Sequence, residues 1–146
     1  MDFSTSLFPD KDFFDLLPLD WKESITPYWK DYKNSSEIYT LSENNKLIGG
    51  GIVFTKTTPD MMYSKDYSDA WFKKGYAYIG FLWINENYRG QQLGSKWLDL
   101  LFKKNPNQKF WLSVEDHGLV DFYKRNNFIL VDEHFHEQKE WILTYG

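Results

Sequence analysis

The 146-residue chain is predicted to fold as a mixed α/β (α+β) domain, in which one sheet carries helices on both of its faces. Two observations predict this class. Short apolar, strand-like segments and helical patterns follow one another along the chain. Aromatic residues make up 20% of the chain, which is too apolar for a disordered protein and sufficient for a hydrophobic core. No repeat or linker interrupts the pattern, so we expect a single domain over residues 1–146.

The first part of the chain predicts two helices and a hairpin. Apolar residues at helical spacing indicate a helix that stops near Pro18, and a second helix that Pro27 limits. A polar turn, SENNK over 42–46, then separates two apolar runs, as in a β-hairpin. The expected elements are helices over 12–19 and 21–33 and strands over 37–41 and 47–54.

The segment 55–75 has no clear period and is long for a plain connection. Long loops in compact domains often cover binding sites. Four aromatic residues in and just after it could line an acceptor pocket, or could equally pack the loop onto the sheet. They are Trp71, Phe72, Tyr76 and Tyr78.

The second half predicts strands and helices in alternation. The helix over 92–103 has the clearest pattern, because its apolar residues repeat on one face. A polar turn separates the last two strands. The expected elements are strands over 78–84, 110–114, 128–131 and 141–145 and helices over 92–103 and 118–125.

The junction between the strand over 78–84 and the next helix carries the strongest functional signal. A Gly-containing turn, within YRGQQLGSKW over 88–97, opens the helix. Such a junction points several backbone N–H groups the same way, at the positive end of the helix dipole. We therefore expect a phosphorylated ligand of nucleotide type.

Composition excludes several classes of function. The net charge is −4, and because residues 1–23 hold six acids against two lysines, the remainder is balanced. A basic face for nucleic acid is therefore not expected. The acidic start could attract a cationic substrate, although a solvated surface is the more common explanation. The chain has no cysteine, no run long enough to span a bilayer and no signal-like start, so a cytoplasmic protein is expected.

The segment FLWINENYRGQQLGSKWLDLLF over 81–102, followed by FWLSV over 110–114 and DFYKRNNF over 121–128, resembles the GNAT superfamily of acyl-CoA-dependent N-acyltransferases. The family signature Arg/Gln-x-x-Gly-x-Gly/Ala falls on 89–94, with Gln92 in place of the middle glycine. A second signature, Phe-Tyr-x-x-x-Gly-Phe, falls on 122–128, with Asn127 in place of the glycine. The resemblance implies a mostly antiparallel sheet with a splayed central strand pair.

The resemblance also implies acetyl-CoA, or another acyl-CoA, as the cofactor. Its pyrophosphate would lie on backbone N–H groups of the turn and first helical residues. Its pantetheine arm would pair with the strand over 78–84 like an added strand, close to Asp116. The implied cofactor-binding residues are Leu82, Trp83, Ile84, Arg89, Gly90, Gln91, Gln92, Leu93, Gly94, Ser95, Asp116 and Tyr123.

The implied reaction is direct transfer of an acetyl group to a primary amine. Tyr123 is the candidate general acid for the departing thiolate, and a backbone N–H near Leu82 or Trp83 is the candidate donor to the carbonyl oxygen. Glu86 and Glu115 are candidate general bases, because both follow strands that could face the site. Glu86 could equally be an exposed turn residue, Glu115 a helix cap, and a water chain could replace both.

The acceptor could be a small molecule or a peptide amine, and the protein a monomer or a homodimer. A second hypothesis is an acyl-CoA-binding module without catalysis, and a third is an interaction domain that binds no CoA. His134 and His136 share one strand face near Glu133 and Glu137. We expect an exposed polar hairpin there rather than a metal site.

Overall fold

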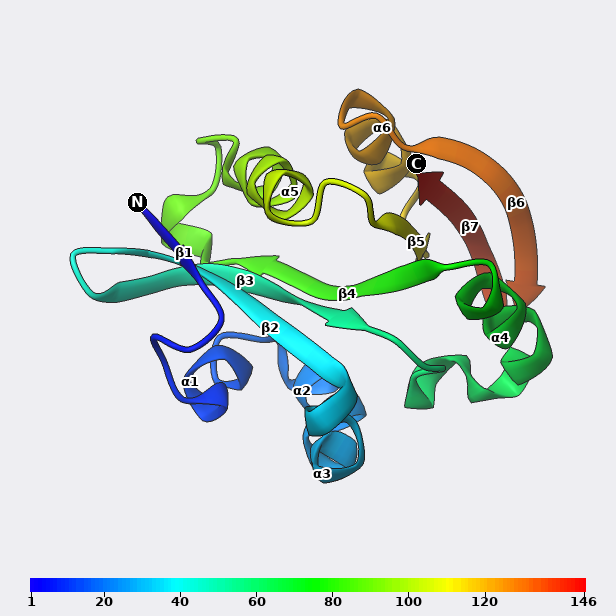
Figure 1. Cartoon of the computed structure of the whole chain (residues 1–146), viewed down its shortest axis with the longest axis horizontal. Helices are drawn as coiled ribbons and strands as arrows, with labels where there is room; N and C mark the ends of the chain where they lie inside the picture. The colour runs from blue at the N-terminus through cyan, green and yellow to red at the C-terminus, as the bar shows by residue number, and fades with distance from the viewer.

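The computed structural model describes all 146 residues as a seven-stranded sheet of order β1-β2-β3-β4-β5-β7-β6 (Figure 1). Every neighbouring pair is antiparallel except β4 and β5, which run parallel. The prediction of a mixed, mostly antiparallel sheet is therefore confirmed. The strands are β1 (Asp2–Ser4), β2 (Ser36–Glu43), β3 (Lys46–Phe54), β4 (Tyr76–Ile84), β5 (Lys109–Val114), β6 (Ile129–His136) and β7 (Gln138–Tyr145).

Helices cover both faces of the sheet, as Figure 1 shows. On one face lie α5 (Leu93–Lys104) and α6 (His117–Arg125); on the other lie α1 (Asp10–Phe14), α2 (Leu19–Ile25) and α3 (Trp29–Tyr32). Trp97, Leu98 and Leu101 of α5 are fully buried on the first face. Phe13 and Ile25 are fully buried on the second. The sheet thus separates two apolar clusters, one under the helices of each face.

Several boundaries differ from the predicted ones. The helix expected over 21–33 is α2, a 3₁₀ turn η1 (Thr26–Tyr28) and α3, because Pro27 breaks the pattern. The helix expected over 12–19 is the five-residue α1. β1 was not predicted, since three residues on a sheet edge carry no readable pattern. β6 continues to His136, because it pairs with β7 along its polar half.

The segment expected to be an irregular loop is largely helical. It forms η3 (Pro59–Ser64) and α4 (Lys65–Lys73), which lie beside the β6–β7 end of the sheet (Figure 1). Tyr67 and Trp71, four residues apart, share the face of α4 that packs on the core. The helix was hard to recognise because only Ser68 is fully covered.

The parallel pair opens beyond its first residues, which confirms the predicted splayed strand pair. β4 and β5 pair only from Tyr76 with Lys109 to Tyr78 with Trp111. Farther along, β4 keeps β3 as its one neighbour and carries a bulge at Phe81, whose φ is 59°. A gap therefore opens between β4 and β5. None of the helices combines the length and the apolar character that a membrane crossing requires.

Candidate functional site

The turn before α5 offers unpaired backbone donors at a helix N-terminus. The first helical hydrogen bond runs from Lys96 N to Gln92 O (3.1 Å), and no side chain caps the helix. The amides of Leu93, Gly94 and Ser95 therefore have no helical acceptor. Gly90 and Gln91 are exposed, and nothing lies near a Cβ built on Gly90. These free amides lie at the turn where the sequence predicts an anion site, which we call the predicted anion site.

The two signature positions 92 and 94 favour glycine for different physical reasons. Gln92 has φ 58° and ψ 31°, a left-handed conformation that favours glycine, so a family signature with glycine at this position is understandable. A Cβ on Gly94 would meet Phe122 Cζ at 3.0 Å. Gly94 therefore lets α5 approach α6 closely, and Asn126 Nδ2 donates to Ser95 Oγ (3.1 Å) at the same contact.

Arg89 joins the turn to the end of β4. Its Nε donates to Ile84 O (3.1 Å), and its guanidinium carbon lies 4.3 Å from the centroid of the Trp83 ring. Trp83 also packs against Trp21 of α2, with centroids 5.3 Å apart. Leu82, Trp83 and Ile84 are half-buried along the part of β4 that has separated from β5. The turn and this strand edge are thus held as one surface.

Tyr123 lies on the face of α6 that packs on the sheet, in the same apolar cluster as the buried residues of α5. It is 7% exposed, and its ring contacts Phe122 and Phe128 at centroid distances of 4.9 and 5.3 Å. Burial raises the pKa of Tyr123, so the phenol stays protonated at neutral pH. Burial likewise raises the pKa of Tyr78, a residue of the opposite core cluster.

The three candidate carboxylates take different places. Asp116 is the N-cap of α6, where its Oδ1 accepts from Gly118 N (2.9 Å). Glu86 is exposed on the 3₁₀ turn η4 (Glu86–Tyr88), next to the predicted anion site. Glu115 follows β5 at the gap, and its pKa is raised by burial and by the charge of Glu140. Glu115 is therefore a candidate base with a raised pKa.

Glu140 is a site residue that sequence reasoning missed. It is 7% exposed on β7, and its Oε2 accepts hydrogen bonds from Tyr63 Oη and from Ser113 Oγ (3.2 Å). Asp60 of η3 and Asp20 of α2 also contribute charge at Glu115. Acids on three separate elements, β7, η3 and α2, therefore contribute negative charge at Glu115. A single glutamate at the start of a strand gave no sequence signal for this.

The histidines of β6 are occupied by aromatic contacts. His136 stacks on Tyr63 and His134 lies against Tyr67, each with ring centroids 4.0 Å apart. His134 Nε2 is 3.1 Å from Asp132 Oδ2, which also accepts from Tyr67 Oη (2.9 Å). No group of three or more His, Cys, Asp or Glu side chains is arranged to hold a metal ion.

The aromatic residues proposed for an acceptor pocket pack in the core instead. Trp71, Phe72 and Tyr78 surround the ring of Trp111, at centroid distances of 6.1, 5.8 and 4.6 Å. Tyr76 packs against Trp71 at 5.1 Å. Of the two interpretations offered by the sequence, the structure favours packing of the segment onto the sheet.

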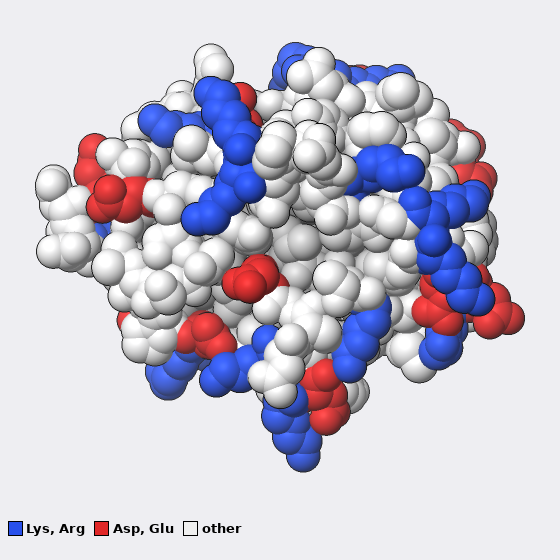
Figure 2. Space-filling view, in the orientation of Figure 1, with Lys and Arg blue, Asp and Glu red and all other residues white.

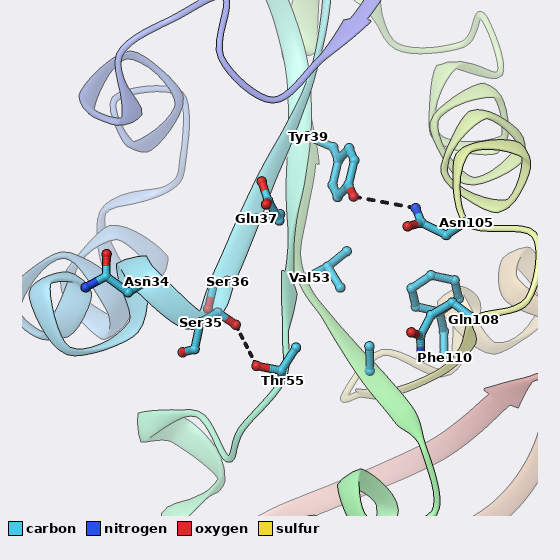
Figure 3. A pocket seen from close by; sticks show the side chains of 11 residues that line it. Asn34, Ser35, Ser36, Glu37, Tyr39, Val53, Thr55, Asn105, Gln108 and Phe110 are labelled. Atoms are coloured by element: carbon cyan, nitrogen blue, oxygen red, sulfur yellow. Dashed lines mark hydrogen bonds between the residues drawn. The ribbon is translucent and has the colours of Figure 1, made fainter.

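A hollow of about 380 Å³ lies at the other end of the β4–β5 pair (Figure 3). Tyr39 and Asn105 border it, and Asn105 Nδ2 donates to Tyr39 Oη (3.5 Å). It borders the strands where they still pair, at Ala77 and Phe110, and includes neither Tyr123 nor the predicted anion site. On the face in Figure 2, basic and acidic residues alternate, without one continuous basic surface.

Solved structures share this fold over nearly the whole chain. An aminoglycoside 6'-N-acetyltransferase from Enterococcus faecium superposes with a TM-score of 0.71 at 14% identity, covering 99% of this chain and 96% of that one. An aminoglycoside 6'-N-acetyltransferase complexed with coenzyme A gives 0.70 at 13%, with the same coverage. A GNAT family acetyltransferase from Elizabethkingia anophelis with acetyl-CoA bound gives 0.63 at 15%, covering 99% and 95%.

A search of curated proteins finds no match to this sequence. The family model described as the acetyltransferase (GNAT) family, however, matches residues 7–128. This range contains the predicted anion site, the open edge of β4 and Tyr123. The chain belongs to the acetyltransferase (GNAT) family.

Proposed function

We propose that this protein is an acyl-CoA-dependent N-acyltransferase that moves an acetyl group from acetyl-CoA to a primary amine. The observation that carries the proposal is the opening between β4 and β5, with the uncapped N-terminus of α5 and the phenol of Tyr123 on the same face of the sheet. Backbone donors for phosphate and a protonated phenol on one side of such an opening are what acyl transfer from a CoA thioester requires.

The residues present fit the proposed cofactor. The free amides of Leu93, Gly94 and Ser95 would hold the pyrophosphate, and the exposed Gly90 and Gln91 leave room for it. The unpaired edge of β4 would hold the amides of the pantetheine arm. When bound, acetyl-CoA supplies an activated acetyl group as a thioester. The two structural neighbours with CoA or acetyl-CoA support this assignment by fold.

The residues of the chain then have separable tasks. The bulge at Phe81 turns the backbone of β4, and an N–H near Leu82 or Trp83 donates to the acetyl carbonyl oxygen. Glu115, in preference to Glu86, accepts a proton from the incoming ammonium. The free amine forms the C–N bond as the C–S bond breaks. Tyr123 gives its phenolic proton to the sulfur and regains one from the nitrogen through solvent.

The acceptor that we propose is a small-molecule amine. Aminoglycoside 6'-N-acetyltransferases are among the structural neighbours, and an aminoglycoside is a small-molecule amine. The acids around Glu115 would also suit a cationic acceptor.

Calorimetry with CoA and acetyl-CoA tests the cofactor site first. We expect binding, followed by release of CoA thiol when acetyl-CoA is mixed with an amine panel that includes kanamycin and spermidine. Binding without thiol release from any amine would favour the acyl-CoA-binding module. Absence of binding at millimolar concentration would contradict both functions and leave an interaction domain.

A further inference from the structure

The end of β5 and the start of β7 bring two glutamates together. The strands pair from Phe110 with Tyr145 to Val114 with Trp141, so the next position of each is Glu115 and Glu140. Ser113 Oγ donates to Glu140 Oε2 (3.2 Å), which places these two side chains on one face of the sheet. Glu115 is the first residue after β5, two positions beyond Ser113, and it stands opposite Glu140 when the register is continued by one position.

The two carboxylates differ in their surroundings. Glu140 is 7% exposed and is held by two hydroxyl donors, Tyr63 Oη and Ser113 Oγ. A buried carboxylate with such donors keeps a fixed orientation. Glu115 is exposed and free of such donors except for Gln138. One member of the pair is therefore fixed within the fold and the other faces the gap.

The groups that act on Glu115 come from three other elements. They are Glu140 and Gln138 on β7, Asp60 on η3 and Asp20 on α2. Although most of the Glu115 side chain is exposed, partial loss of solvent and the charge of Glu140 are the main causes of its raised pKa, while Gln138 acts in the opposite direction. A carboxyl group of this kind is a better proton acceptor than an ordinary surface glutamate.

We propose that Glu115 and Glu140 form a carboxylate pair at the acceptor side of the gap, in which Glu115 takes the proton of the acceptor ammonium and Glu140 is a positioning residue. Glu140 places a fixed negative charge beside Glu115, and its bond from Tyr63 ties η3 to β7. In the transfer, an N–H bond of the ammonium breaks, an O–H bond forms on Glu115, and solvent later receives that proton. This role rests on the proposed acyltransferase function.

The charge effect can be measured without any acceptor. Glutamate side-chain carboxyls labelled with ¹³C are titrated by NMR in the wild type, Glu140→Gln, Tyr63→Phe and Glu43→Gln, and Glu115→Gln identifies the signal. We expect the midpoint of Glu115 to lie above that of exposed glutamates, and to fall in Glu140→Gln because a negative neighbour is lost. Glu43→Gln, at the remote β2–β3 turn, leaves it unchanged.

Tyr63→Phe separates charge from tethering. This variant keeps the carboxylate of Glu140 and removes one donor, so the Glu115 midpoint is expected to stay close to the wild-type value. Equal falls in Tyr63→Phe and Glu140→Gln, with equal losses of Tm, would show that both act only by displacing η3, and would overturn the proposal. An unshifted Glu115 signal in the wild type would also overturn it.

Kinetics then test the role in transfer. With acetyl-CoA and the amine that releases thiol, kcat/KM is followed from pH 5.5 to 9. When kcat/KM at low pH is divided by the plateau value of the same protein, this ratio should be about threefold higher in Glu140→Gln than in the wild type. The reason is that Glu115 loses its proton more readily without the neighbouring negative charge. An unmoved acid limb overturns the proposal. Failure of acetyl-CoA to bind would instead refute the proposed function, while the NMR result would still report on the pair.

Discussion

The two sides of the β4–β5 gap are built in different ways. On the α5 side, the predicted anion site consists of backbone amides from consecutive residues, with no charged side chain required. On the β7 side, Tyr63 of η3 and Ser113 of β5 donate hydrogen bonds to Glu140, and these two residues lie 77 and 27 positions away in sequence. A site made of backbone amides is formed by one short segment of sequence, whereas a site made of side chains from distant segments depends on the whole fold.

The largest effect is expected from Gly94→Glu, which attacks the backbone side. The new Cβ would meet Phe122 at 3.0 Å, and the carboxylate would place negative charge where phosphate is proposed to bind. CoA affinity should fall on the order of 1,000-fold, measured by calorimetry. Gly94→Ala tests the packing contact alone and should cost far less. Similar losses in both variants would show that packing, not anion binding, explains the glycine.

A change in turnover is expected from Tyr123→Phe. The ring contacts with Phe122 and Phe128 remain, so the fold and CoA binding should be kept. Loss of the phenolic proton should lower kcat about 100-fold in the thiol-release assay. Unchanged kcat, with wild-type CoA affinity, would remove Tyr123 from the reaction and leave solvent as the acid.

The same difference explains what the sequence could predict. The turn over 88–97 was recognisable because strand, glycines and amphipathic helix are contiguous. The sheet class and the splayed pair were also predicted, since alternating apolar segments and the family motifs specify them. Glu140 was missed because nothing within a few residues of it marks burial or hydroxyl partners.

The local sequence pattern also did not predict the structure where tertiary packing determines it. The segment over 65–73 reads as polar, yet it is the helix α4, because Tyr67 and Trp71 anchor it on the core. The four aromatic residues near it had two open interpretations, and only the contacts with Trp111 favour packing. Asp116, expected beside the pantetheine arm, is engaged as the cap of α6.

The variant Gln92→Gly tests the backbone conformation of the turn before α5 by its effect on the free energy of unfolding. Gln92 has φ 58°, and a left-handed conformation costs a non-glycine residue about 1–2 kcal/mol. Glycine removes this strain but gains entropy in the unfolded chain, so we expect a net stabilisation of about 0.5–1 kcal/mol by urea denaturation. Asn127→Gly, at φ 72°, is the matched control and should gain less, because asparagine tolerates this region. A destabilised Gln92→Gly would indicate a side-chain contact that outweighs the strain.

The smallest change in stability is expected from loss of the hydrogen bond between Tyr67 of α4 and Asp132 of β6. The hydrogen bond from Tyr67 is the main reason that the pKa of Asp132 is lowered from 3.8. Burial raises the pKa of Tyr67 to about 12, so its hydroxyl remains a donor. Because the pKa of Asp132 is lower in the folded than in the unfolded chain, this interaction stabilises the fold fully at pH values above the unfolded-state pKa. The stabilisation is lost as the pH falls through the lowered, folded-state pKa.

Tyr67→Phe should therefore reduce stability by about 0.5 kcal/mol or less at pH 7, because the pair is exposed, and the difference should shrink below pH 3.8. Urea denaturation at several pH values measures it, with Tyr28→Phe, an exposed tyrosine on η1, as control. A loss of stability that stays constant in acid would mean that the packing of the Tyr67 ring, not its hydrogen bond to Asp132, holds α4 against β6. The contact of η3 and α4 with β6 and β7 would then depend on apolar packing, except at Glu140, which accepts a hydrogen bond from Tyr63.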